Sequence, residues 1–286
     1  MRGQGWRPDR RGARSGAGGE RSRFRTVRSL LAVALALLAA CDAAPSAMAP
    51  DTAPTALSDC NALAFEGADF VVCTAVPGTH RIATALASAG GEPYRGFSAF
   101  AAAEPERAAR VAFAFNGGMF DDRGMPIGLY VEDGRQRHKL NRAKGAGNFH
   151  LMPNGVFFGG ETDWQVLETD RYAARTDRKP RFATQSGPML VIDGKSHPRF
   201  SADGESRFVR NGVGVDRSGR AHFAMSEQPV SFGTFARLFR DRLHTPQALF
   251  LDGNVSALWD PQSSRMDGSV PLGPLLVVEK AAKGGA

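Results

Sequence analysis

The sequence predicts an α+β (mixed α/β) fold, a single domain in which long, partly antiparallel twisted sheets are flanked by helices. Many apolar runs of strand length are separated by Gly, Asp or Asn, and two further stretches show helical periodicity. No linker, repeat or low-complexity run divides the chain between Asp59 and Lys280, which is long enough to enclose one large core. We therefore expect one domain over residues 59–280.

Apolar runs bounded by turn residues are the candidate strands. Asp216-Arg-Ser-Gly219 has the composition of a tight reversal and predicts a hairpin between two of them. Asp133-Gly134, beside Glu132, predicts a second hairpin. The predicted strands are Phe70–Thr74, Val111–Phe115, Ile127–Val131, Gly155–Phe158, Met189–Ile192, Gly212–Val215, His222–Met225, Ala248–Leu251 and Leu275–Val278.

Helical periodicity indicates two helices. His80–Ala89 is rich in Ala and amphipathic. Ser231–Leu243 places Phe235, Leu238 and Phe239 at spacings of three and four residues, behind a Ser231 that can cap the helix. We expect this apolar stripe to pack against a sheet.

Residues 1–41 are expected to be a leader that contains a lipoprotein signal peptide. Leu30–Ala40 is an apolar stretch of eleven residues behind several Arg residues, which suits a secretory signal and is too short to span a bilayer. Leu38-Ala-Ala-Cys41 has the form of a bacterial lipobox, so Cys41 is the predicted lipidation site. The alternatives are an ordinary signal peptide with a coincidental cysteine, or a buried helix.

Residues 42–58 are rich in Ala, Pro, Ser and Thr, which predicts a flexible tether between the lipid and the domain. The predicted location is therefore the periplasm or cell envelope, as a lipoprotein that contacts the membrane through the lipid on Cys41.

The basic character of the whole chain belongs to its leader. Of the 36 basic and 29 acidic residues, nine Arg and two acidic residues fall within residues 1–40, and the remaining 27 of each sign balance. Nucleic-acid binding requires a clustered basic surface that displaces counterions. No nucleic-acid partner is therefore predicted.

Cys60 and Cys73 are expected to form a disulfide, which an extracytoplasmic compartment permits. The alternative is two buried free thiols. Two cysteines without nearby histidines do not make a zinc ligand set, and no dinucleotide loop, phosphate-binding lysine loop or EF-hand spacing is found. No cofactor is predicted, and the requirement for a metal stays open.

Three glycine-containing polar clusters each adjoin a predicted strand. They are Asn116-Gly117-Gly118-Met119-Phe120, Gln185-Ser186-Gly187-Pro188 and Asp252-Gly253-Asn254. Strand ends are where sheet proteins commonly place binding and catalytic groups. We therefore expect the three clusters to belong to one site.

The amino-acid sequences of these segments and their order along the chain resemble those of the phosphodiester glycosidase family. The resemblance runs from about Phe113 to Val278, and one difference is Asn254, where members outside this bacterial branch tend to have Gly after Asp-Gly. The resemblance implies that the protein is a hydrolase that cleaves a glycosyl-phosphodiester bond, in which a sugar is linked through phosphate. Further matching segments are Arg210-Asn-Gly-Val-Gly214, Gly145-Ala-Gly-Asn-Phe-His150, Asn154-Gly-Val-Phe-Phe158 and Leu251-Asp-Gly-Asn-Val-Ser256.

Cleavage of a glycosyl phosphodiester expels a phosphate monoester, which is a weak base and needs little help from a general acid. The protein mainly needs a carboxylate that acts as base or nucleophile, and donors that hold the phosphate. Asp252 is the first candidate for the carboxylate, although Asp-Gly is also a common turn dipeptide. Asn116 is expected to assist through its amide, and Gly117 and Gly118 through exposed N–H groups, although glycines there also suit a turn.

Other residues of the clusters are expected to bind substrate. Arg210 and Asn211 would clamp the phosphate, unless Arg210 is a surface ion pair. Ser186 is expected to line the pocket and not to act as a nucleophile, because the glycines of a nucleophile elbow are absent. The complete predicted binding set is Gly117, Gly118, His150, Gln185, Ser186, Gly187, Arg210, Asn211, Gly253 and Asn254.

The predicted function is a lipid-anchored hydrolase that acts on a glycosyl phosphodiester in envelope or exopolysaccharide metabolism. Its expected partners are a small carbohydrate or glycosyl-phosphate substrate and the membrane. The alternative is a non-catalytic carbohydrate-binding envelope lipoprotein.

Overall fold

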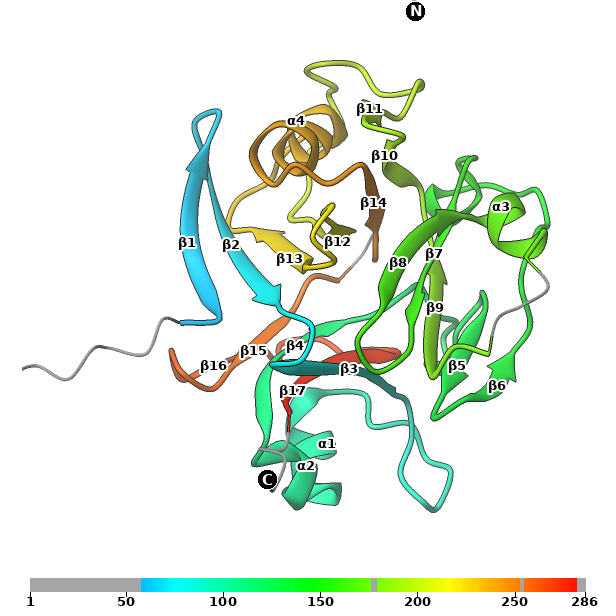
Figure 1. Ribbon diagram of the computed structural model, residues 1–286, viewed down its shortest axis with the longest axis vertical. Coiled ribbons are helices and arrows are strands. Elements are labelled where there is room, and N and C mark those ends of the chain that lie inside the picture. Colours follow the sequence, from blue (N-terminus) through cyan, green and yellow to red (C-terminus); the bar gives the residue numbers. More distant parts are fainter. Residues whose placement is uncertain (1–57, 176–178, 253–254, 282–286) are drawn as a thin grey trace, which may run out of the picture. The chain divides into compact units, whose positions relative to one another are not determined.

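Three antiparallel sheets organise residues 58–175, 179–252 and 255–281, the parts that the computed structural model describes (Figure 1). These residues belong to one compact unit, Thr55–Ala286. The predicted leader, Cys41, almost all of the tether, Gly253 and Asn254 lie outside the described residues. The fold is mostly sheet with a few helices, an α+β arrangement as predicted.

The largest sheet has seven strands in the order β1-β2-β13-β12-β14-β10-β11. Its first two strands carry the Cys60–Cys73 disulfide that the sequence predicted, between residues that face each other in the ladder. Asp216–Gly219 forms the predicted turn between β12 and β13. The strands are β1 (Cys60–Phe65), β2 (Ala68–Ala75), β10 (Met189–Ile192), β11 (Lys195–Ser196), β12 (Asn211–Val215), β13 (Ala221–Ser226) and β14 (Gln247–Phe250).

The other two sheets have five strands each. The first runs β16-β15-β4-β17-β3 and contains β3 (His80–Ala85), β4 (Val111–Asn116), β15 (Leu258–Asp260), β16 (Arg265–Met266) and β17 (Leu275–Lys280). The second runs β6-β5-β9-β7-β8 and contains β5 (Tyr130–Glu132), β6 (Arg135–His138), β7 (Gly155–Gly159), β8 (Trp164–Glu168) and β9 (Phe182–Ser186).

The three sheets meet around Phe223 of β13, which is fully buried. Its ring lies 5.5 Å from the rings of Phe113 and Phe115 on β4 and 5.7 Å from the ring of Phe157 on β7, measured between centroids. A shared aromatic cluster fixes the sheets relative to one another, because buried aromatic side chains remove large apolar areas from water and pack in preferred geometries. The polar ends of strands from different sheets are thereby held close together.

Helices cover the outer faces of the sheets (Figure 1). The predicted cap of the long helix is confirmed, since Ser231 accepts a hydrogen bond from the Thr234 N–H. Phe235 and Phe239 pack with Phe70 and Phe250 on the seven-stranded sheet, as the apolar stripe predicted. The helices are α1 (Phe97–Ala103), α2 (Pro105–Ala108), α3 (Thr169–Ala173) and α4 (Phe232–Arg237), with a π-helical turn at Leu238–Arg242 and a 3₁₀ turn at Asn148–His150.

The predicted helix at His80–Ala89 is wrong, because its first six residues form strand β3. They pair in antiparallel register with β17, so that Ala83 faces Val277 and Ile82 faces Val278. Pairing with a buried apolar strand outweighs the helix preference of alanine, which is a weak local effect. The predicted strand at Ile127–Val131 also begins later, at Tyr130. None of the described helices is both long enough and apolar enough to cross a bilayer.

Three buried histidines make the stability depend on pH. Burial lowers the pKa of His80, His197 and His222, although Asp59 raises the pKa of His80 and Asp216 that of His222. Below about pH 6.5 the unfolded chain therefore binds more protons than the folded protein. The free energy of unfolding is expected to fall as the pH falls from 7.5 to 5.5.

Urea midpoints at pH 7.5, 6.5 and 5.5 measure this dependence. His197→Gln removes one of the three groups, so the drop between pH 7.5 and 5.5 is expected to be smaller in the variant than in the parent protein. An equal drop in both would show that His197 does not contribute.

Candidate active site

A cavity of about 580 Å³ lies at the ends of strands from different sheets. Its wall includes Asp252 after β14, the segment 119–122 after β4, the loop 146–150 that leads to β7, and Arg95 before α1. A cavity of this size accommodates a small ligand. Asp252 and His150 are the two sequence-predicted site residues that line it.

Burial and a hydrogen bond hold the backbone of Asp252 in place. It follows Ala248–Leu251, all of which are fully buried, and is itself only 4% exposed. Its N–H donates a hydrogen bond of 3.2 Å to Oδ1 of Asn211 on the neighbouring strand β12. The carboxylate therefore stands at the end of a rigid core strand, at the cavity wall.

Two asparagines fix the chain before and after Asp252. Asn211 donates through Nδ2 to Oδ1 of Asn116, at 2.7 Å. Asn116 in turn donates to the carbonyl of Val255 at 2.8 Å and accepts from the N–H of Ala257 at 2.9 Å. Asn116 and Asn211 do not line the cavity, and their amides hold the segment that carries Asp252.

Replacing Asn211 with Leu is expected to lower the free energy of unfolding by about 1–3 kcal/mol, because the buried Asp252 N–H and Oδ1 of Asn116 each lose a hydrogen-bond partner. The exposed Asn61, whose side chain donates to the carbonyl of Ser58, provides the control Asn61→Leu. Urea unfolding of both variants measures the difference, and an equal effect would show that the buried pair does not organise the segment.

The N–H groups of Gly117 and Gly118 are used within the protein. Gly117 donates to the carbonyl of Pro274 at 2.7 Å, and Gly118 donates to the Thr184 hydroxyl at 3.1 Å. A Cβ at Gly118 would lie 2.4 Å from the carbonyl oxygen of Gln185. Gly118 therefore lets the chain pack closely against β9, and the N–H groups of both glycines are bonded within the protein.

The second cluster, Gln185, Ser186 and Gly187, is buried behind the cavity wall. Ser186 donates from its hydroxyl to the carbonyl of Leu251, and Gly187 lies against Asn154. The Gln185 amide makes four hydrogen bonds, which join it to Leu129, Asn141 and Thr169. This cluster fastens β9 to the Asp252 strand and to the loops around it.

Arg210 is fully buried and packs against Phe232, the first residue of α4. Its guanidinium donates to the carbonyls of Val230 and Ser206 and stacks on Phe232, with the Cζ atom 3.6 Å from the ring centroid. Burial lowers the pKa of Arg210 to about 10, so it remains protonated at neutral pH. Of Asn116, Gln185, Arg210 and Asp252, which the sequence predicted to surround one hollow, only Asp252 lines it.

One ring nitrogen of His150, Nδ1, bonds to the protein backbone, and the other, Nε2, is the one that can interact with a substrate. Its Nδ1 lies 2.9 Å from the carbonyl oxygen of Ala143, and because a carbonyl only accepts, Nδ1 carries the hydrogen. In the neutral ring Nε2 is then an acceptor. The histidine also lines the cavity that holds Asp252, so the site combines an acidic group with an imidazole.

Asp121 and Asp122 line the same cavity. The Asp121 carboxylate accepts from the N–H groups of Met125 and Arg123, which hold its pKa below the ordinary value. It is therefore a turn-forming group. Among the described residues, no cluster of three or more His, Cys, Asp or Glu side chains is arranged to hold a metal ion.

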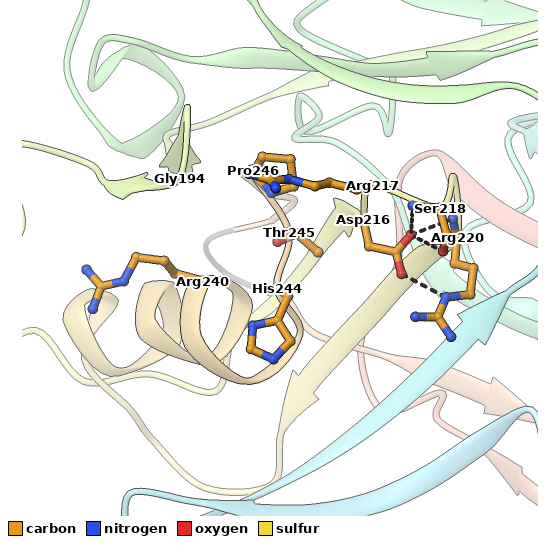
Figure 2. Close-up of a pocket in the computed structure, with 9 residues that line it drawn as sticks. All are labelled: Gly194, Asp216, Arg217, Ser218, Arg220, Arg240, His244, Thr245 and Pro246. Atoms are coloured by element: carbon orange, nitrogen blue, oxygen red, sulfur yellow. Dashed lines mark hydrogen bonds and ion pairs between the residues drawn. The ribbon is translucent and has the colours of Figure 1, made fainter.

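A second cavity, also of about 580 Å³, lies at the opposite end of β14, where Pro246 precedes the strand (Figure 2). Arg217, Arg220 and Arg240 line it, together with Asp216. Figure 2 shows the Asp216 carboxylate turned toward its own hairpin. Burial raises the pKa of Asp216. Hydrogen bonds from Ser218, His222 and Arg220 outweigh this effect and hold that pKa well below its usual range. This carboxylate therefore bonds within its own turn. No residue of the predicted binding set lines the cavity.

The model of the family described as phosphodiester glycosidase matches residues 109–269, more than half of the chain. The chain belongs to this family. The Escherichia coli (strain K12) protein YigE, described as uncharacterized, is 36% identical over 186 residues, which are 65% of this chain and 72% of YigE.

The fold of this family member is also similar to a solved structure. The catalytic domain of zebrafish N-acetylglucosamine-1-phosphodiester alpha-N-acetylglucosaminidase, auto-inhibited by its pro-peptide, aligns with a TM-score of 0.53 and 12% sequence identity. The alignment covers 78% of this chain and 82% of the zebrafish chain. At this identity the similarity establishes the fold.

Sequence reasoning missed Arg95, the cation of the cavity wall. It lines the cavity with Asp252 and His150 but precedes the family match, which begins at residue 109. Arg95 lies outside all three glycine-containing clusters and next to no predicted strand. Nothing in its sequence neighbourhood indicates that the fold brings it to the same cavity as Asp252.

Proposed function

We propose that this protein hydrolyses a glycosyl phosphodiester, releasing a free sugar and a phosphate monoester. The observation that carries the proposal is the position of Asp252 on a cavity of about 580 Å³, within the residues that match the phosphodiester glycosidase family. Water adds to the anomeric carbon, and the bond between that carbon and the phosphate oxygen breaks.

Asp252 acts as the base that activates the water, or as the nucleophile that precedes it. The hydrogen bond from its N–H to Asn211 and the bonds of Asn116 to residues 255 and 257 hold the backbone that carries the carboxylate. Positioning of this kind contributes to catalysis because the reacting groups need not be ordered during the reaction.

His150 accepts a hydrogen bond from a sugar hydroxyl through Nε2 or, when both ring nitrogens carry a proton, passes the proton of Nε2 to the departing oxygen. The departing group is a phosphate monoester, a weak base, so protonation contributes less here than in the hydrolysis of an ordinary glycoside. The carboxylate therefore carries the larger part of the proposed mechanism.

The proposed setting is the cell envelope, where the domain is tethered through a lipid on Cys41 and acts on envelope or exopolysaccharide material. The lipobox-like Leu38-Ala-Ala-Cys41 and the Cys60–Cys73 disulfide support this setting, because disulfides persist outside the reducing cytosol. Mass spectrometry of membrane-extracted protein tests it through the mass of the lipid-modified N-terminal peptide.

The activity is tested with the purified protein and a panel of sugars joined through phosphate to a second alcohol. The first member is an α-linked N-acetylglucosamine-1-phosphodiester, the bond named in the description of the zebrafish enzyme. We expect free reducing sugar and phosphate monoester in equal amounts from at least one member. Release of sugar 1-phosphate and the free second alcohol would indicate a phosphodiesterase that breaks the other ester bond, and saturable binding without product would favour the carbohydrate-binding alternative.

A further inference from the structure

Arg95 is a cation in the cavity wall with unused hydrogen-bonding capacity. It lines the cavity together with Asp252 and is partly exposed. Its Nη1 atom is buried and makes no hydrogen bond with the described residues. Its guanidinium also forms no ion pair within residues 58–175, 179–252 and 255–281. Such a group gains free energy when an anionic oxygen approaches it.

The surrounding chain is built to hold this side chain. The guanidinium lies over the ring of Phe120, with Cζ 5.5 Å from the centroid. Gly124 leaves room for it, since a Cβ there would lie 2.1 Å from Nη1. The backbone of Arg95 has a φ of 56°, in the left-handed region that non-glycine residues seldom adopt, and its carbonyl accepts from the Leu272 N–H at 3.0 Å.

The carboxylates nearby do not neutralise Arg95. Asp121 is bonded to the N–H groups of its own turn and to Arg123, at 3.0 Å. The cation therefore remains available to a ligand. A guanidinium matches two oxygens of a phosphoryl group, and in a cavity its charge is less screened than at an open surface.

We propose that Arg95 forms an anion subsite that holds the phosphoryl group of the substrate. This inference rests on the proposed function and names the part of the cavity that distinguishes a phosphate-linked sugar from an ordinary glycoside. Arg95 binds the phosphodiester and stabilises the charge that grows on the leaving phosphate, while the sugar lies toward Asp252. Selectivity for phosphate-linked sugars then comes from a residue outside the family match.

The first test compares two substrates of the same sugar, a glycosyl phosphodiester and an uncharged nitrophenyl glycoside. Arg95→Gln is expected to lower kcat/KM for the phosphodiester about 10- to 100-fold, the usual effect of losing a charged hydrogen-bonding partner, and to change kcat/KM for the nitrophenyl glycoside much less. Arg95→Lys keeps the charge without the planar fork and is expected to fall between. Equal losses on both substrates, or none on either, would overturn the proposal.

The second test does not need turnover. Binding of inorganic phosphate and of a sugar 1-phosphate is measured by calorimetry for the parent protein, Arg95→Gln and Arg217→Gln. Arg217 lines the other cavity of equal volume and provides the matched control (Figure 2). We expect Arg95→Gln to weaken binding of the sugar 1-phosphate at least 10-fold and Arg217→Gln to leave it unchanged.

The two tests separate the subsite from the function. If no substrate is hydrolysed but sugar 1-phosphate binds and depends on Arg95, the subsite stands and the proposed function fails. If phosphodiesters are hydrolysed and neither binding nor selectivity depends on Arg95, the function stands and the subsite is overturned. Urea midpoints close to that of the parent protein show that the variants are folded.

Discussion

Replacing Asp252 with Asn is expected to lower kcat for a glycosyl phosphodiester by about 10²–10⁴-fold, the range for loss of a positioned acid–base group. The variant keeps the size of the side chain and removes its ability to take a proton or attack carbon. The backbone bond from residue 252 to Asn211 does not involve the carboxylate, so the backbone at residue 252 keeps this anchor. Substrate binding should change less than kcat.

Initial rates and urea midpoints of the parent protein and of Asp252→Asn provide the measurement. Asp203→Asn is the matched control, because Asp203 is an exposed carboxylate that pairs with Arg207 and does not line the cavity. Its kcat should equal that of the parent. Full activity in Asp252→Asn, with a normal urea midpoint, would remove Asp252 from the mechanism.

Replacing Gly118 with Ala is expected to destabilise the protein by about 1–3 kcal/mol, the usual cost of overpacking a tight interior. A Cβ there would lie 2.4 Å from the Gln185 carbonyl oxygen and 2.7 Å from the Thr184 hydroxyl oxygen. The first of these contacts is with backbone, which cannot turn away. Since Gly118 directly precedes the cavity-lining segment 119–122, activity should fall as well.

Gly268→Ala separates this contact from the general effect of adding a methyl group to glycine. A Cβ at Gly268 would meet no atom within 4 Å, so its urea midpoint should stay close to that of the parent. If Gly118→Ala is as stable and active as Gly268→Ala, the close packing of the Asn116 cluster against β9 does not matter for the site.

Much of the fold follows from local patterns in the sequence. Short apolar runs such as Val111–Asn116 form core strands for two reasons. Strand pairing satisfies the hydrogen bonds of their backbone, and burial removes their apolar side chains from water. The Ser231 cap also depends on neighbouring residues alone. The strand at His80–Ala85 could not be predicted this way, because its partner β17 lies almost two hundred residues further along the chain.

The site was predictable only in part. Asp252 and His150 come from segments that the family resemblance marked, and they share one cavity. Gln185 and Arg210 looked like ligand-binding groups, but they form hydrogen bonds within the protein and do not line the cavity. A sequence shows that a residue can donate or accept, whereas only the fold shows which partner it meets.

Arg95 shows the opposite case, a residue of the site that no sequence pattern indicated. Its position depends on Phe120, which lies under its guanidinium, and on Gly124, which leaves space for Nη1. Both follow Arg95 by more than twenty residues, and neither forms a recognisable motif with it. The burial of one nitrogen without a partner is a property of the folded chain.

The most direct test of the account is a crystal structure of Asp252→Asn with an uncleaved glycosyl phosphodiester. We predict that the anomeric carbon lies next to the side chain at position 252 and that a phosphoryl oxygen lies within hydrogen-bonding distance of the Arg95 guanidinium. Ligand bound instead in the cavity of Figure 2, or with its phosphate away from Arg95 and its sugar away from position 252, would contradict the account.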